Sequence, residues 1–265
     1  MPRAPRADAL REKGPTPIGT AVFTGLRAAD PFLQYAILRN GWGIRLIEYF
    51  GGRAIQPLNL SSAGVLGLQP YYAVIVGLSV GSAFKHITWR LGIAEQKMPV
   101  WAALFIGAFN SFFNTLNTIL SLWSVTSMAP LSLHGWQGLS ADKLPTSPVF
   151  WAGVGLFVTG ISMELISEFQ RKAFKADPKN EGKPYGGGLF TFARHINLGG
   201  YVTWRTGYAL AAAGLPLGLF TGGFLLYDFT HRAVPSVDEY CTKRYGEEWK
   251  AIKQRVPYRL IPGIY

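Results

Sequence analysis

The side chains best suited to chemistry lie in three polar segments of the last third of the chain, residues 170–178, 194–197 and 256–265. The first segment carries Arg171 and Lys175, which share one helix face because they are four residues apart. Two cations on one face suit a phosphate group, although basic residues beside a membrane more often contact lipid headgroups. The second segment holds His195, which can carry a proton or donate a hydrogen bond. Together the segments suggest a site for an anionic cofactor.

Apolar segments long enough to enter a bilayer surround these polar stretches. They are residues 62–84, 99–128, 148–166 and 201–229. The last one contains Gly214-Leu215-Pro216, which would interrupt a helix and favours two short helices folded as a hairpin. Residues 17–50 hold Arg27, Arg39 and Arg45 among apolar residues. That region predicts an interfacial helix or a poor membrane span.

These segments predict an all-α, polytopic integral membrane protein with about five to six transmembrane helices, a C-terminal helical hairpin and a cytosolic tail. We expect residues 1–61 to form an N-terminal tail with an interfacial or poorly defined membrane segment. Residues 62–265 are expected to form a single membrane domain. The basic loops at 85–97 and 168–194 are expected to face the cytosol, since positive charge marks that side of a membrane.

Charge and cysteine content restrict the partners of the chain. It carries 26 lysines and arginines against 15 acidic residues, a formal net charge of +11. The basic residues lie in loops beside apolar segments, so we expect a membrane and no nucleic acid as partner. Cys241 is the only cysteine, which excludes an intramolecular disulfide and cysteine zinc clusters, and no metal is expected. The N-terminus shows no apolar signal segment, and the predicted location is the endoplasmic reticulum membrane.

Polar residues also occur inside the apolar segments. Three of them share one helix face in the second segment: Asn110, Asn114 and Asn117. Their amides can hydrogen-bond between helices or line a substrate cavity. Glu164 and Glu168 lie one turn apart at the end of the third segment. We expect Glu168 to pair with Lys172 on a surfacing helix, whereas the deeper Glu164 is either structural or catalytic.

The order of the C-terminal motifs resembles that of the steroid 5α-reductase and sterol C14-reductase superfamily, and most closely that of its shorter DUF1295 members. The resemblance covers about residues 160–265. The matching segments are Gln170-Arg171-Lys172-Ala173-Phe174-Lys175, Gly188-Leu189-Phe190, Arg194-His195 with Asn197 and Gly200, His231-Arg232, Asp238-Glu239-Tyr240-Cys241, Lys243 to Trp249, and Val256 to Tyr265. Ile196, Leu198 and Tyr201 stand where the superfamily has a proline, a tyrosine and an acid.

The resemblance implies that this half binds NADPH at the cytosolic face, in an NADPH-dependent oxidoreductase that acts on CH–CH groups. The implied substrate is a sterol-like, isoprenoid or other enone lipid. The residues that it assigns to the cofactor are Gln170, Arg171, Lys175, Arg194, His195, Asn197, Arg232, Tyr245 and Arg259. It makes Asp238 a candidate for supplying a proton or orienting the nicotinamide, and Tyr258 a residue that closes the site. Glu164 completes the set of candidate catalytic residues.

Two other functions remain open. Methyltransferases of the isoprenylcysteine carboxyl methyltransferase type share an Arg-His-containing C-terminal half and bind S-adenosylmethionine there. Paired cations such as Arg171 and Lys175 favour a dinucleotide instead, because the methyl donor has no phosphate. The altered segment Arg194-His195-Ile196-Asn197 also allows a non-catalytic membrane scaffold or lipid-binding protein.

Overall fold

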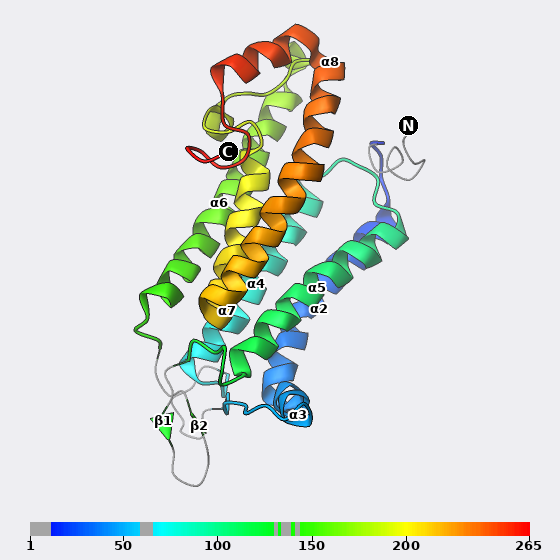
Figure 1. Ribbon diagram of the computed structural model, residues 1–265. Helices are drawn as coiled ribbons and strands as arrows, with labels where there is room; N and C mark the ends of the chain where they lie inside the picture. The colour runs from blue at the N-terminus through cyan, green and yellow to red at the C-terminus, as the bar shows by residue number, and fades with distance from the viewer. Residues whose placement is uncertain (1–11, 59–65, 130–131, 134–138, 141–143) are drawn as a thin grey trace. The chain divides into compact units, whose positions relative to one another are not determined.

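The computed structural model describes residues 12–58, 66–129, 132–133, 139–140 and 144–265 (Figure 1). It divides into two compact units, unit 1 (Met1–Phe150 with Ala212–Gly214) and unit 2 (Trp151–Ala211 with Leu215–Tyr265). The elements in chain order are α2 (Pro17–Arg39), α3 (Trp42–Tyr49), α4 (Pro70–Gly92), α5 (Val100–Leu122), β1 (Ser132–Leu133), β2 (Leu139–Ser140), α6 (Pro148–Ala176), η2 (Pro178–Asn180), η3 (Gly188–Thr191), α7 (Ile196–Asp228), the π-helical turn η4 (Phe229–Ala233) and α8 (Val234–Arg255). The predicted domain boundary at residue 61 stays a prediction.

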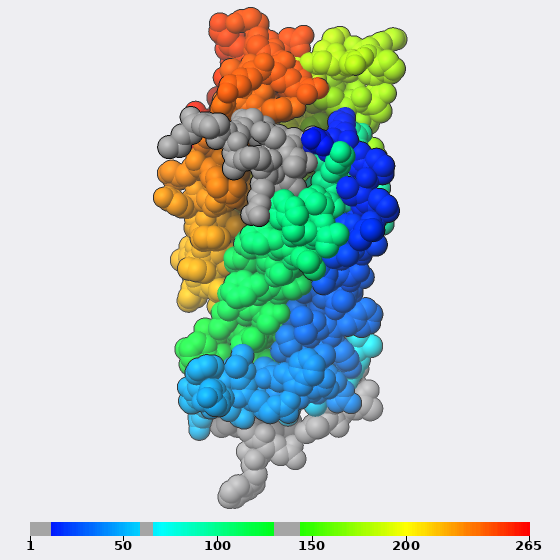
Figure 2. Space-filling view, turned by 90° about the vertical axis from the view of Figure 1, so that its right-hand side faces the viewer, coloured from blue at the N-terminus to red at the C-terminus, as the bar shows by residue number. Residues whose placement is uncertain are grey.

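Unit 1 is a bundle of α2, α4 and α5, with the short helix α3 packed against α2 and α5. Figure 2 shows α2 and α5 side by side along their length. Proline begins α2 at Pro17 and α4 at Pro70, because its fixed φ suits the first helical turn and its missing N–H has no partner there. The two strands β1 and β2 form a minimal antiparallel ladder, with Ser132 opposite Ser140.

A wholly buried ion pair occupies the interior of this bundle. Arg27 and Asp30 on α2 have side chains that are 0% exposed, and their Nη2 and Oδ2 atoms are 3.3 Å apart. Asn114 on α5 donates to Asp30 Oδ2 at 2.6 Å and to the Ser82 hydroxyl on α4 at 3.0 Å. Gln34 donates to Asp30 Oδ1 at 3.1 Å. The prediction that amides of the second apolar segment hydrogen-bond between helices is therefore confirmed for Asn114.

The first apolar segment differs from its prediction. Its predicted start, residues 62–65, lies outside the described residues, and α4 continues through Lys85 and His86 to Gly92. Both residues are buried within this helix, so the predicted loop does not begin at residue 85. Arg90 is also buried in this helix. Its guanidinium donates to the hydroxyl of Thr16, which precedes α2, and to that of Thr20 within α2. A buried cation is tolerated where its donors are satisfied in this way.

Unit 2 is built on close contact between α6 and the first half of α7. Four glycines in register make this possible: Gly153, Gly160, Gly200 and Gly207. A Cβ added at Gly153 would lie 2.8 Å from the Gly207 carbonyl oxygen, and one at Gly160 would lie 2.7 Å from that of Gly200. Glycine allows two membrane helices to approach until their backbones touch. Van der Waals contact at this distance stabilises the pairing of helices in a bilayer.

The predicted hairpin in the last apolar segment is confirmed. Ala213 and Gly214 leave the helical conformation inside α7, and Gly214 takes a φ of +68°, which suits glycine. The two halves of α7 then pack against each other, since a Cβ at Gly222 would meet the side chain of Thr206. Figure 1 shows the two halves running side by side.

Three described helical stretches are long and apolar enough to cross a membrane: Val100–Leu122, Pro148–Ala176 and the continuous run Ile196–Arg255. The chain is therefore a helical, polytopic membrane protein. In unit 2, the run ends in η4 and α8, after which residues 256–265 return to the start of α7.

Candidate functional site

The start of α7 and the C-terminal segment 256–265 are joined through the backbone. The amide of Arg194 donates to the Tyr258 carbonyl at 3.0 Å, and that of His195 donates to the Arg259 carbonyl at 2.8 Å. The Arg194 guanidinium also donates to the Pro257 carbonyl at 3.0 Å. Two polar segments that are some sixty residues apart in sequence therefore lie against each other, as the sequence predicted.

His195 lies at the centre of the predicted cofactor residues. Its side chain is buried, and burial lowers the pKa to about 4, helped by the positive charge of Arg194. The charges of Arg171, Arg259 and Asp238 also act on this ring. A neutral imidazole at physiological pH offers one donor and one acceptor nitrogen. Because cations surround it, the site combines positive charge with an uncharged hydrogen-bonding group.

Two buried nitrogen atoms in this cluster have no hydrogen-bond partner among the described residues, His195 Nε2 and Arg194 Nε. Burial of Arg194 also lowers the pKa of its guanidinium. Buried polar atoms nearly always have a partner, from the protein, from water or from a ligand. These two atoms therefore fit the polar groups of a bound cofactor.

Glu168 links two of the predicted cofactor residues, which the sequence did not indicate. Its carboxylate is buried and forms an ion pair with Arg171, while Asn197 donates to its other oxygen at 2.6 Å. Helical spacing paired Glu168 with Lys172 at i+4, and the structure shows Arg171 at i+3 and Asn197 on its carboxylate; the pairing with Lys172 stays a prediction. Glu168 thus holds the side chains of Arg171 and Asn197 in place. Only the contact with Arg171 has a signal in the sequence, the i+3 spacing on one helix.

Lys175 and Tyr245 also come together, one on α6 and the other on α8. The Lys175 ammonium donates to the Tyr245 hydroxyl at 3.2 Å and lies 4.8 Å from the centre of its ring. Lys175 donates as well to the Lys183 carbonyl. Its predicted partner on the helix face, Arg171, is turned to Glu168, so the two cations have separate partners in this structure.

Gln170 supports the glycine-containing loop. Its Oε1 accepts from the Leu189 amide at 2.9 Å, in the first turn of η3, which begins at Gly188. Gly188 has a φ of +51°, and a Cβ there would collide with the Gln170 amide group. Gln170 therefore has a structural role in the loop that leads into Arg194.

The candidate catalytic residues do not share one environment. Glu164 accepts a hydrogen bond from the Trp204 indole at 2.8 Å, and Asp238 accepts one from the Trp249 indole at 2.9 Å. Trp249 in turn lies 6.0 Å from the His195 ring, between ring centres, which connects Asp238 to the cluster. The side chain of Tyr258 is 41% exposed. All three remain predictions for catalysis.

Arg232, another predicted cofactor residue, has no described contact with the His195 cluster. It forms a two-bond ion pair with Asp228 at the start of η4, with distances of 2.7 and 2.5 Å. Its side chain is 73% exposed. Its assignment to the cofactor stays a prediction.

We predict that Glu168→Ala lowers the free energy of unfolding by about 2 kcal/mol, because it removes hydrogen bonds to a buried carboxylate. Denaturant titration in mild detergent measures this. The control is Glu181→Ala, at an exposed position, which should change stability by less than about 0.5 kcal/mol. Equal effects of the two substitutions would show that Glu168 does not organise the site.

The arrangement defines a class of protein, a polytopic helical membrane protein whose C-terminal unit gathers cations and buried hydrogen-bonding groups. The family described as "Protein of unknown function (DUF1295)" matches residues 97–256. The chain belongs to this DUF1295 family, so the relationship expected from the motifs is confirmed.

Individual relatives carry two kinds of names. The chain is 39% identical over 241 residues to the "Probable O-methyltransferase ustE" of Ustilaginoidea virens, covering 88% of this chain and 82% of that protein. It is 28% identical to a Delta(14)-sterol reductase of Gibberella zeae, over 91% of this chain and 64% of the relative. It is also 28% identical to the Delta(14)-sterol reductase of Methylotuvimicrobium alcaliphilum, over 42% of this chain and 30% of the relative. The chain thus spans less than two thirds of either reductase.

Proposed function

We propose that this protein is a membrane-embedded, NADPH-dependent reductase of a carbon–carbon double bond in a sterol-like, isoprenoid or other enone lipid. The observation that carries the proposal is the cluster around His195, where cations surround buried nitrogen atoms without a partner among the described residues. The similarity to two Delta(14)-sterol reductases supports the same reaction type. The cofactor would supply the hydride.

The residues of the site would divide the work between charge and hydrogen bonding. Arg171, Arg259 and Lys175 would hold phosphate oxygens, since charge-assisted hydrogen bonds to phosphate are strong. His195 and Asn197 would bind uncharged polar groups. Reduction consumes one hydride and one proton for each double bond. Tyr258 retains a phenolic hydrogen, whereas Asp238 and Glu164 accept from indoles, so Tyr258 is the simplest proton donor of the three.

The orientation and organelle follow from charge and substrate. The segments that carry the cation cluster are basic, and positive segments stay on the cytosolic side of a membrane. We therefore propose that unit 2 presents the cofactor site to the cytosol, where NADPH is available. We propose the endoplasmic reticulum membrane as the location of the protein, because the proposed substrate is a lipid.

Methyl transfer is a second candidate, because the relative from Ustilaginoidea virens is named a probable O-methyltransferase and aligns over most of both chains. A methyltransferase would bind S-adenosylmethionine in the same cluster. Its sulfonium centre carries a positive charge, so the cations of the cluster favour the dinucleotide.

The reaction itself tests the proposal. Purified protein in nanodiscs is incubated with a lipid enone and NADPH, and in parallel with S-adenosylmethionine. Consumption of NADPH together with a product two hydrogen atoms heavier is the expected result. A product that gains one methyl group, formed only with S-adenosylmethionine, would replace the proposal by the second candidate.

A further inference from the structure

The short helix α3 crosses the ends of α2 and α5 in unit 1 and packs against both (Figures 1 and 2). Gly41 makes the sharp turn between α2 and α3 with a φ of +64°, a conformation that glycine adopts without strain. The Ile55 amide donates to the Leu122 carbonyl at 2.8 Å, which ties the segment after α3 to the last residue of α5. Helix α3 therefore lies at one end of Val100–Leu122, a stretch that can cross a membrane.

The apolar side chains of α3 point both into the bundle and away from it. Gly43 and Ile47 are buried, and a Cβ added at Gly43 would lie 2.5 Å from Leu122 Cδ1. Four large apolar side chains remain exposed on the outer surface: Trp42, Leu46, Tyr49 and Phe50. At the end of a membrane-spanning helix, such side chains lie in the interface between lipid and water, which tryptophan and tyrosine favour.

Three exposed arginines flank these apolar side chains: Arg39, Arg45 and Arg53. Glu48 is the only acidic residue between positions 39 and 53, so three cations against one carboxylate leave an excess of two positive charges. Among the residues that the structure describes, none of the three guanidinium groups has an ion pair or a hydrogen bond. A guanidinium group binds phosphate oxygens through paired hydrogen bonds. The outer surface of α3 thus combines apolar side chains with cations that suit phosphate.

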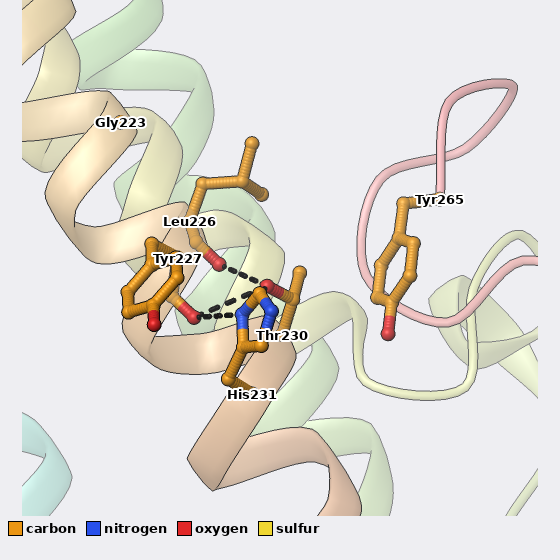
Figure 3. Close-up of a pocket in the computed structure, with 6 residues that line it drawn as sticks. All are labelled: Gly223, Leu226, Tyr227, Thr230, His231 and Tyr265. Carbon is orange, nitrogen blue, oxygen red and sulfur yellow. Dashed lines mark hydrogen bonds between the residues drawn. The ribbon is translucent and has the colours of Figure 1, made fainter.

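The cavity of about 450 Å³ beside η4 in unit 2 differs from this surface (Figure 3). There Thr230 donates to the Leu226 carbonyl at 2.8 Å, and His231 Nδ1 lies 2.9 Å from the Tyr227 carbonyl oxygen. These polar side chains are used within their own helix, whereas the arginines around α3 are not. The positive charge makes α3 the stronger candidate for an interaction surface.

We propose that α3 lies in the plane of the membrane interface and binds the headgroups of anionic phospholipids. Its eight residues extend only about 12 Å, which is too short to cross a hydrocarbon core of about 30 Å. In the interface, the apolar side chains enter the edge of the acyl layer while the arginines meet the phosphates. Anionic lipids are favoured because their net negative charge attracts the arginines, whereas the choline of a zwitterionic lipid cancels the phosphate charge. This surface is independent of the proposed function.

A fluorescent reporter beside α3 tests the proposal on the whole protein in nanodiscs. In a Cys241→Ser background, Asn40→Cys supplies a single cysteine at an exposed position next to Arg39, and bimane is attached to it. The nanodiscs contain equal amounts of a lipid with a nitroxide near its headgroup, either phosphatidylglycerol or phosphatidylcholine. We expect phosphatidylglycerol to quench the bimane roughly threefold more strongly at low salt. Equal quenching by the two lipids would overturn the proposal. Quenching by neither would do the same, since α3 would then lie outside the membrane.

Two triple variants separate local charge from total charge. The test variant carries Arg39→Gln, Arg45→Gln and Arg53→Gln. The control variant removes the same charge from exposed lysines elsewhere, with Lys13→Gln, Lys179→Gln and Lys250→Gln. The test variant should lose the preference for phosphatidylglycerol, and the control variant should keep it. An equal loss in both would contradict the assignment to α3.

Salt tests the same contact without any change in the arginines. At about 1 M salt the Debye length falls to about 3 Å, so the preference for phosphatidylglycerol should disappear while quenching by phosphatidylcholine stays the same. Tyr49→Ser with Phe50→Ser should instead weaken quenching by both lipids, because it removes apolar contact with the acyl layer. A preference that persists unchanged at high salt would overturn the electrostatic contact that we propose.

Discussion

Asp30→Ala is expected to destabilise the protein by about 3–5 kcal/mol, because it leaves the guanidinium of Arg27 buried without the carboxylate that balances its charge. Both side chains are 0% exposed, and Asn114 and Gln34 also donate to Asp30. The loss of one carboxylate therefore removes the acceptor of three donors in the interior of unit 1. Denaturant titration in mild detergent gives the change in unfolding free energy.

The control for this prediction removes both charges. The double variant Arg27→Met with Asp30→Leu replaces the ion pair by apolar side chains of similar size, which in buried sites is often neutral. We expect it to recover most of the stability that Asp30→Ala loses. A double variant that is no more stable than Asp30→Ala would show that the charge of Arg27 is not the cause.

Gly160→Leu is expected to have a comparable effect in unit 2. An added Cβ would meet the backbone of α7 at Gly200 and Trp204, and backbone cannot move aside as a side chain can. We expect a loss of about 3 kcal/mol or more, at the upper end of overpacking effects. Thermal melting in detergent measures it.

Gly155 provides the matched control on the same helix. It is exposed, and a Cβ there would meet nothing within 4 Å. Gly155→Leu should leave the melting temperature unchanged or raise it slightly, because leucine favours a helix more than glycine does. Similar losses in Gly160→Leu and Gly155→Leu would contradict close backbone packing between α6 and α7.

The sequence predicted the features that depend on local chemistry. Gly214 and Pro216 indicated the hairpin in α7, because glycine and proline act on the backbone directly. The Arg194-His195 segment and the C-terminal segment were expected to share a site, and backbone hydrogen bonds join them. Motif order was the signal for that long-range contact.

Features that depend on tertiary neighbours were missed. Lys85 and His86 looked like the end of a membrane segment, yet α4 continues past them and buries both. Arg27 suggested an interfacial helix, because a lone arginine among apolar residues usually lies at a membrane surface. Its burial beside Asp30, which also accepts from Asn114 on α5, depends on how the helices pack. Helical spacing suggested Lys172 as a partner of Glu168 but gave no sign of Asn197, twenty-nine residues away, which donates to its carboxylate.

The central claim is that the His195 cluster binds a phosphorylated dinucleotide, and thermal stability with NADPH, NADH or S-adenosylmethionine tests it most directly. A ligand at 100 times its dissociation constant stabilises the native state by about 2.7 kcal/mol, which is readily measured. The wild type is compared with Lys175→Ala and with Lys179→Ala, an exposed lysine on η2. We predict stabilisation by NADPH in the wild type and Lys179→Ala, and its loss in Lys175→Ala. Stabilisation by S-adenosylmethionine alone, or by none of the three, would contradict the account.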